Sequence, residues 1–364
     1  EDVNVQDEDG DTLLMLATGN GHIDIVRALI HANANVNLKG DDGYTAFMLA
    51  VSKGHIDIVK TLSHANADVN LKSDDGFTPL IFAAINGHID MVKTLIDANA
   101  NVNLKSDNEF TPLMIAALKG NIDMVQALIH ANADVNMRNN DGFTALMVAA
   151  KNGHIDIVKT LSHANADVNM KGNDGYTPLM FAAMHGHIDM VKTLIDANAD
   201  VNMKNNDEYT ALMFAAINGD IDMVKTLSHA NADVNMKGND GYTPLMFAAI
   251  NGDINMVKTL SHANADVNMK GNDGYTALML AASQGHIDMV QALIQANADV
   301  NVQNDHGYTA LIAAASIGHQ DIVQVLLHAK ADTSLQTMEG ETALDIAKSL
   351  ENDELTTLLS NAEV

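Results

Sequence analysis

The chain has 364 residues, 47% of them hydrophobic, which is enough to bury a substantial core. Its 20 Lys and Arg face 47 Asp and Glu, and a formal charge of -27 repels phosphate backbones and anionic lipid headgroups, so we expect neither nucleic acid nor membrane surfaces as partners. The absence of cysteine excludes disulfides, thiolate metal sites and cysteine nucleophiles, and no apolar run approaches the ~18 residues needed to span a bilayer.

One threonine recurs every 33 residues along the whole sequence, with no insertion or deletion. These threonines are Thr12, Thr45, Thr78, Thr111, Thr144, Thr177, Thr210, Thr243, Thr276, Thr309 and Thr342. A fixed period of this length is typical of a solenoid, in which each unit must stack on its neighbours to bury its apolar side. We therefore predict one domain over residues 1–364. Residues 1–7 are the tail of a preceding or shortened repeat, 8–338 are ten repeats, and 339–364 are a C-terminal capping repeat.

Each repeat predicts a turn followed by two short helices. In the sixth repeat, Gly175 lies at the tip of an expected hairpin turn. Thr177 is placed to cap the first helix with its hydroxyl, and Pro178 suits the first helical turn because its missing N–H has no partner there. Gly186 ends this helix after about two turns, and a second helix follows up to Asn198.

The unit resembles the ankyrin repeat, and the resemblance covers the whole chain. The shared features are the period, Thr177-Pro178-Leu179, Gly186-His187 and the closing Ala199-Asp200-Val201-Asn202. The resemblance implies an all-α fold: an ankyrin-repeat solenoid of helix-turn-helix units with β-hairpin-like fingers.

Two positions depart from the family pattern. Asn stands where the family usually ends the second helix with Gly; because Asn tolerates the left-handed conformation best after Gly, we expect the same geometry. Met replaces the family's usual His three residues after the cap at Met15, Met48, Met114, Met147, Met180, Met213, Met246 and Met279, with Ile81 and Ile312 in two further repeats. We expect soft apolar packing where the family has a polar brace.

The two ends differ from the middle. Val3-Asn4 lies 33 residues before Val36-Asn37, so the chain opens with the tail of a repeat. At the other end Glu341 replaces the aromatic residue and Asp345 replaces Met. These changes predict a last repeat with a polar outward face.

Two columns of residues are candidates for binding a partner. The first, called the aromatic column, immediately precedes the cap threonine in the interior repeats: Tyr44, Phe77, Phe110, Phe143, Tyr176, Tyr209, Tyr242, Tyr275 and Tyr308. The second, called the apolar stripe, lies two residues before the helix-ending glycine: Ile85, Leu118, Met184, Ile217 and Ile250, with Lys151 in the same register. The resemblance places both on the concave side of the solenoid, where such proteins commonly make contacts. An alternative stays open: the aromatics pack on neighbouring fingers and the stripe seals adjacent helices.

The 16 histidines do not predict a metal site. Equivalent residues such as His22 and His55 are one repeat apart, too far to share a metal ion at ~2 Å bond lengths. The stretch Asp7-Glu8-Asp9-Gly10-Asp11 begins like a calcium loop but lacks the closing Glu, so we interpret it as an acidic turn. Acidic columns such as those of Asp174, Asp189 and Asp200 indicate either a solvated face or the steering of a basic partner.

These features favour a non-catalytic protein-protein interaction module that binds a protein or extended peptide. A basic partner would suit its acidic columns. Alternatives are a structural spacer or scaffold, or the ankyrin part of a larger enzyme, channel or secreted effector. Because every acid, base and hydroxyl recurs at the repeat period, no singular catalytic cluster forms, and we expect no enzyme activity and no cofactor. We expect a monomer in the cytoplasm, although secretion stays open because a chain starting at Glu1 hides any removed signal peptide.

Overall fold

The structure is a computed structural model that describes residues 2–362. These residues form short helices, whose bounds are α1 Leu13–Gly19, α2 Ile23–His31, α3 Ala46–Lys53, α4 Ile56–His64, α5 Pro79–Asn86, α6 Ile89–Asp97, α7 Pro112–Lys119, α8 Ile122–His130, α9 Ala145–Lys151, α10 Ile155–His163, α11 Pro178–Met184, α12 Ile188–Asp196, α13 Ala211–Ile217, α14 Ile221–His229, α15 Pro244–Asn251, α16 Ile254–His262, α17 Ala277–Gln284, α18 Ile287–Gln295, α19 Ala310–Ile317, α20 Gln320–His328, α21 Ala343–Ser349 and α22 Asp353–Ala362. Within the described chain the β pairing is one isolated antiparallel bridge, between Gln6 and Thr12. The predicted all-α repeat of helix pairs is confirmed.

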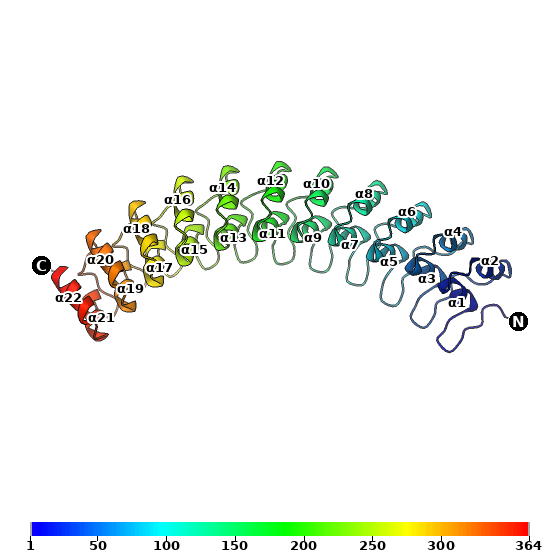
Figure 1. Ribbon diagram of the computed structural model, residues 1–364, viewed down its shortest axis with the longest axis horizontal. Helices are drawn as coiled ribbons and strands as arrows, with labels where there is room; N and C mark the ends of the chain where they lie inside the picture. The colour runs from blue at the N-terminus through cyan, green and yellow to red at the C-terminus, as the bar shows by residue number, and fades with distance from the viewer. Residues whose placement is uncertain (1, 363–364) are drawn as a thin grey trace. The chain divides into compact units, whose positions relative to one another are not determined.

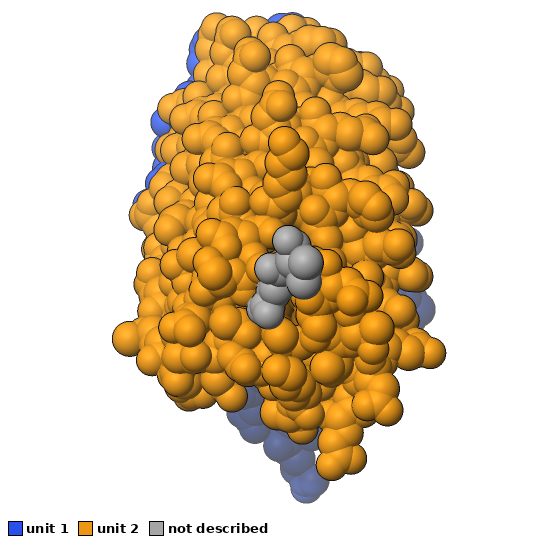
Figure 2. Space-filling model, turned by 90° about the vertical axis from the view of Figure 1, so that its left-hand side faces the viewer, with its two compact units in different colours: residues 1–178 blue, residues 179–364 orange. Residues whose placement is uncertain are grey.

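The chain divides into two compact units, residues 1–178 and 179–364, drawn in different colours in Figure 2. The division falls at the start of α11. In each unit the odd-numbered helices form one row and the even-numbered helices a second, and the fingers project from the odd-numbered side (Figure 1). Within each unit, helices pack on their repeat partners and on the equivalent helices of the next repeat, as α1 packs on α2 and α3 and as α13 packs on α14 and α15. The single domain over 1–364 stays a prediction.

The helices begin where the sequence predicts. The cap hydroxyl of a first helix accepts a hydrogen bond from the backbone N–H three residues on, as Thr78 does from Ile81 at 3.3 Å. The same bond forms at Thr12, Thr45, Thr111, Thr144, Thr210, Thr243, Thr276, Thr309 and Thr342. Pro79, Pro112 and Pro244 occupy the first helical turn. Local sequence therefore fixes where each helix pair starts.

The helix ends also follow the prediction. Gly87 closes α5 with φ +73°, a left-handed conformation that glycine adopts without strain. The asparagines after the second helices share this conformation with φ of 60 to 66°: Asn33, Asn66, Asn99, Asn132, Asn165, Asn198, Asn231, Asn264 and Asn297. Lys330 takes the same conformation in the tenth repeat, with φ 65°. Because a lysine there carries no sequence signal, the geometry is imposed by the neighbouring helix pairs.

Methionines lie at the core of the contact between repeats. Met48, Met114 and Met147 are fully buried, and the corresponding Ile81 and Ile312 are buried equally well. Valines and leucines of the second helices, such as Val59 and Leu62, complete the same core. The polar brace of the family is thus replaced by apolar packing, as the sequence predicts.

An asparagine ladder links successive repeats within each unit. The side-chain oxygen of Asn235 accepts a hydrogen bond from the backbone N–H of Asp266, 31 residues ahead, at 2.8 Å. Equivalent bonds of 2.7–2.8 Å are made by Asn4, Asn37, Asn70, Asn103, Asn136, Asn202, Asn268 and Asn301. Each bond fixes the spacing of adjacent repeats and satisfies a loop amide.

A second ladder runs along the fingers. Lys237 Nζ donates to the backbone carbonyl of Lys270 at 2.6 Å, and Lys270 Nζ donates to that of Gln303 at 2.9 Å. Gln6, Lys39, Lys105, Arg138, Lys204 and Gln303 make the same contact to the next finger. Within a finger, backbone bonds such as Gly40 N–H to Tyr44 carbonyl, at 2.9 Å, form the expected hairpin-like turn. These lysine, arginine and glutamine side chains therefore hold the fingers in register.

The last repeat has the polar outward face that the sequence predicts. Asp345 is exposed where other repeats bury Met, and its carboxylate accepts a bond from the backbone N–H of Thr342 at 3.0 Å. Lys348 is exposed and Thr356 is half-buried, at positions where interior repeats bury alanine and valine. None of the helices in residues 2–362 has both the length and the apolar character that crossing a membrane requires.

Replacing Asn235 with alanine tests the asparagine ladder. The change leaves the Asp266 amide without its acceptor, and we expect a loss of about 1 kcal/mol in unfolding free energy. Urea denaturation followed by circular dichroism measures it. The matched control is Asn255→Ala, which changes an exposed residue of α16 and should alter stability by less than about 0.5 kcal/mol. Equal effects of the two variants would contradict the ladder.

Candidate functional site

The aromatic column lies where each finger meets its first helix. Its residues from Tyr44 to Tyr308 are all half-buried, each directly before the cap threonine. Backbone bonds fix them: the Tyr209 N–H donates to Asn205 Oδ1 at 2.8 Å, and the Tyr242 N–H donates to Asp240 Oδ1 at 3.0 Å. Each of these residues thus keeps part of its surface exposed.

The buried parts of these rings pack on phenylalanines of the first helices. Tyr44 and Phe77 both contact Phe82, with ring centroids 5.1 and 5.5 Å apart. Tyr209 and Tyr242 contact Phe247 in the same way, at 5.6 and 5.9 Å. These contacts agree with part of the structural alternative, with a helix as one of the packing partners. The sequence signal for it is phenylalanine four residues after the cap threonine, at Phe82, Phe181, Phe214 and Phe247.

Some rings also cover a glycine of the next finger. A Cβ at Gly238 would collide with the Tyr209 ring, and a Cβ at Gly172 would lie 2.8 Å from Phe143. The Tyr209 hydroxyl donates to Asp240 Oδ2 at 2.7 Å. Burial, together with this hydrogen bond and the nearby carboxylates, raises the pKa of Tyr209 to about 12. The aromatic residue of one repeat is therefore positioned by the finger of the next.

The apolar stripe lies beside the column, at the ends of the first helices. Ile85 is 36% exposed and Leu118 is 44% exposed, whereas Met184, Ile217 and Ile250 are half-buried. Lys151 occupies the same register, with its ammonium group 5.5 Å from the Phe143 ring centroid. In unit 1 the stripe thus presents exposed apolar surface, and in unit 2 it is partly covered.

The next repeat holds the backbone of the stripe in place. Asn218 Nδ2 donates to the Met184 carbonyl at 2.8 Å, and Asn251 Nδ2 donates to the Ile217 carbonyl at 2.9 Å. A histidine ring nitrogen of His286 lies 2.9 Å from the Ile250 carbonyl. These bonds leave the stripe side chains on a rigid support. They were missed from the sequence because the partners lie 34 to 36 residues apart.

The fingertips carry exposed carboxylates in both units. Asp41, Asp42, Asp74, Asp75, Asp107, Asp141, Asp207, Asp240, Asp273 and Asp305 are all exposed. At the first fingers, burial raises the pKa of Asp11, and the neighbouring Asp7 and Asp42 raise it further. Within residues 2–362 no three His, Asp or Glu residues are arranged to hold a metal ion. What the fingertips can offer is a row of acceptors and negative charge.

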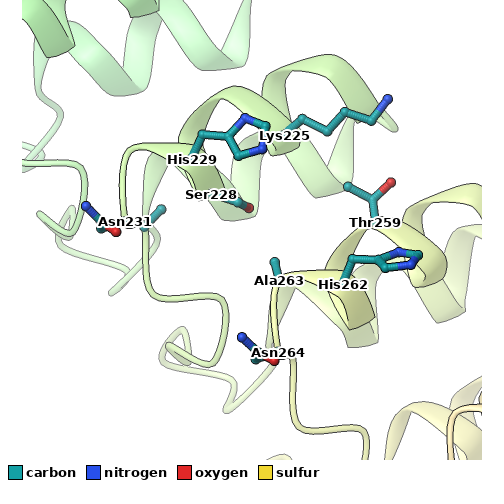
Figure 3. Close-up of a pocket in the computed structure, with 9 residues that line it drawn as sticks. Lys225, Ser228, His229, Asn231, Thr259, His262, Ala263 and Asn264 are labelled. Carbon is teal, nitrogen blue, oxygen red and sulfur yellow. The ribbon is translucent and has the colours of Figure 1, made fainter.

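A separate cavity of about 670 Å³ lies between α14 and α16, on the side of the second helices (Figure 3). It is lined by Lys225, Ser228, His229, Asn231, Ala232, Thr259, His262, Ala263 and Asn264. The Ser228 hydroxyl oxygen is buried without a hydrogen-bond partner in the structure. Isoleucine occupies this helix position at Ile96, Ile129 and Ile294, whereas Ser63, Ser162 and Ser261 repeat the serine. The cavity therefore lies beside a serine at a position where some repeats have a larger side chain.

The family model described as Ankyrin repeats (3 copies) matches residues 1–73, 62–139, 80–172, 125–205, 146–238, 212–304, 245–337 and 297–364. The overlapping matches cover the chain from end to end. No curated protein matches the chain. The resemblance found in the sequence is thereby confirmed.

Titration of the tyrosines tests the contact between Tyr209 and Asp240. The folded-state pKa of Tyr209 is raised to about 12, so the contact stabilises the folded protein fully below pH about 10, where the tyrosines of the unfolded chain ionise. This stabilisation is lost as the pH rises through the folded-state pKa. In an ultraviolet titration, Tyr209→Phe should remove the step near pH 12. Asp240→Asn keeps an acceptor but removes the charge, so it should lower that pKa. A Tyr209→Phe variant that instead loses a step near pH 10 would refute the contact.

Filling the cavity between α14 and α16 should stabilise the protein. Ser228→Ile buries apolar surface and removes the unpartnered hydroxyl, so we expect a gain of about 1 kcal/mol in unfolding free energy. The comparison variant is Ser228→Ala, which removes the hydroxyl without filling the space and should gain less. Urea midpoints measure both. A destabilised Ser228→Ile would show that the space is too narrow for isoleucine.

Proposed function

Since the chain belongs to the ankyrin-repeat family, we propose that the face formed by its fingers and first helices binds an extended basic segment of a protein. We call this surface the finger face of each unit. Ankyrin repeats in general are non-catalytic modules of protein-protein interaction. The proposal concerns which surface of this chain is used and what kind of partner fits it.

One observation carries the proposal: exposed apolar side chains lie beside supported aromatic rings. Ile85 is 36% exposed and Leu118 is 44% exposed, at the same position of two successive repeats in unit 1. Phe77, at the base of the finger that precedes Ile85, is held by its ring contact with Phe82. Contiguous apolar surface with a polar rim is the usual mark of a protein interface.

Charge indicates the chemistry of the partner. The fingertip carboxylates are exposed at each repeat, whereas basic groups of the same fingers, such as Lys39 and Lys237, donate to backbone carbonyls of the next finger. The net charge of -27 adds a long-range negative field. A segment with regularly placed Lys or Arg would be attracted and aligned by such a row.

A spacer role is the second candidate. The asparagine ladder repeats with bonds of 2.7–2.8 Å in both units, and such uniformity suits a protein that sets a fixed length. A pure spacer differs from a binding module because it has no affinity for basic peptides.

Peptide binding by the full chain distinguishes the two. Extended peptides that alternate Lys or Arg with apolar residues should bind, more weakly as salt rises, and acidic peptides of equal length should not. The double variant Ile85→Ala, Leu118→Ala should weaken binding at least about tenfold, because truncating interface anchors removes more than about 1 kcal/mol. Isothermal calorimetry measures the affinity, and circular dichroism confirms that the variant is folded.

The matched control is Ile25→Ala, which truncates a residue that is 46% exposed but belongs to the second helix α2, outside the finger face. It should leave the affinity unchanged. Unchanged affinity of the double variant would rule out this face, and a preference for acidic peptides would rule out the charge assignment. Absence of any peptide binding would favour the spacer.

A further inference from the structure

The cavity of about 670 Å³ between α14 and α16 lies on the side of the second helices, outside the finger face (Figure 3). Its volume is within the range of small-molecule sites, roughly 300–1,000 Å³. Both helices belong to unit 2, so the cavity is formed within one compact unit. The proposed binding of a basic segment makes no use of it.

The cavity lies where two successive repeats both have Ser-His near the end of the second helix. These pairs are Ser228-His229 and Ser261-His262. The remaining Ser-His pairs of the second helices are followed one repeat later by Ile-Asp: Ser63-His64 by Ile96-Asp97, and Ser162-His163 by Ile195-Asp196. The imidazoles of His229 and His262 therefore line the same space.

The charge of the second helices changes at the same junction. Asn255 of α16 stands where every other repeat has an acidic residue: Asp24, Asp57, Asp90, Asp123, Asp156, Asp189, Asp222, Asp288, Asp321 and Glu354. The bounds of α16 consequently enclose Lys258 but no carboxylate. Asp253 lies at the opposite end of the helix from His262, where it caps the Met256 N–H at 3.1 Å.

These local charges outweigh the net charge of the chain. At physiological salt, charges more than about 8 Å away are largely screened. The groups that line the cavity therefore decide which ligand it accepts, although the chain as a whole carries a charge of -27.

Cationic and hydroxyl donors line the cavity. The Lys225 ammonium pairs with Asp222 at 3.3 Å, but both side chains are exposed, and such a pair is weak enough to be exchanged for a ligand. The Ser228 hydroxyl oxygen is buried without a hydrogen-bond partner in the structure. His262 Nδ1 lies 2.6 Å from the Lys258 carbonyl. Since a carbonyl only accepts, Nδ1 carries the hydrogen, and protonation of the ring adds a positive charge.

The other side of the cavity offers amides. Figure 3 shows Asn231 and Asn264 on the far side from Lys225. Both asparagines follow a helix end, where carbonyls of the last turn repel anions unless they are satisfied. The Ala232 N–H donates to the Leu227 carbonyl at 3.0 Å and so satisfies one of them. Side-chain amides both donate and accept, which suits the hydroxyl groups of a ligand.

We propose that this cavity binds a small phosphate monoester that carries hydroxyl groups, such as a sugar phosphate. The phosphate oxygens accept hydrogen bonds from Lys225, Ser228 and protonated His262. The hydroxyl groups bond to the side chains of Asn231 and Asn264. A phosphate monoester suits the donors because it brings about -1.5 to -2 charges and three acceptor oxygens.

Phosphorus NMR of the full chain with glucose 6-phosphate tests the site. The phosphate signal should broaden at millimolar ligand, and the affinity should fall as salt rises. Ser228→Ile fills the cavity and should weaken binding at least about tenfold, because its side chain occupies the space of the ligand. Circular dichroism confirms that this variant is folded. The matched control is Ser162→Ile, the same change in α10, which should leave the affinity unchanged.

Two exposed positions test the charge. Lys225→Gln should weaken binding about tenfold, because a charge-assisted hydrogen bond is lost. Lys93→Gln, at the same helix position in unit 1, should have no effect. Asn255→Asp restores the carboxylate of the other repeats with almost no change of shape, and should weaken binding about threefold or more.

The ligand series tests the chemistry. Glucose should not bind, and glucose that binds as tightly as glucose 6-phosphate would overturn the phosphate assignment. Inorganic phosphate should bind more weakly than glucose 6-phosphate because it makes no contact with the asparagines, and equal affinity would overturn the hydroxyl contacts. No binding at millimolar ligand, or equal affinity of Ser228→Ile and the unchanged protein, would overturn the site. The double variant Ile85→Ala, Leu118→Ala should bind glucose 6-phosphate normally, which separates this site from the finger face.

Discussion

The packing of each helix pair on the next is the interaction on which the rest of the structure depends. The buried methionines and isoleucines, such as Met48 and Ile81, belong to this core. A single helix pair leaves this surface in water, so a repeat gains its core only from its neighbours. The asparagine ladder adds a directional bond at each junction and sets the distance at which the apolar surfaces meet.

This packing decides which residues are left for a partner. Apolar side chains at the junctions between repeats are buried, and lysines of the fingers, such as Lys237, donate hydrogen bonds to backbone carbonyls of the next finger. What remains exposed is part of each residue of the aromatic column, part of the apolar stripe and the fingertip carboxylates. Because Tyr209 and Tyr242 are already held by Phe247, a partner would meet rings that lose little conformational entropy on binding.

Departures from the repeat are tolerated where the ladders compensate for them. Glu109 and Glu208 replace a turn glycine and adopt φ of 63°, which is unfavourable for a residue with a Cβ. Lys105 and Lys204 form ion pairs with them at 2.6 and 2.7 Å while still donating to the next finger. Ser228 is a different case: it lines a cavity, and Leu227 beside it in α14 stays fully buried.

The sequence alone determined the period, the helix starts and the left-handed helix ends, because a threonine cap, a first-turn proline and an asparagine after a helix act over three or four residues. It also identified the aromatic column and the stripe as surface candidates. It did not show that lysines form a ladder, that Phe82 and Phe247 hold the aromatic rings, or that Lys330 takes a left-handed conformation. Ile25 and Ile58 show the reason most directly: identical local sequence gives 46% exposure in one and 2% in the other. Local conformation is a property of neighbouring residues in the chain, whereas burial and side-chain partners some 30 residues away are decided by which repeat packs alongside.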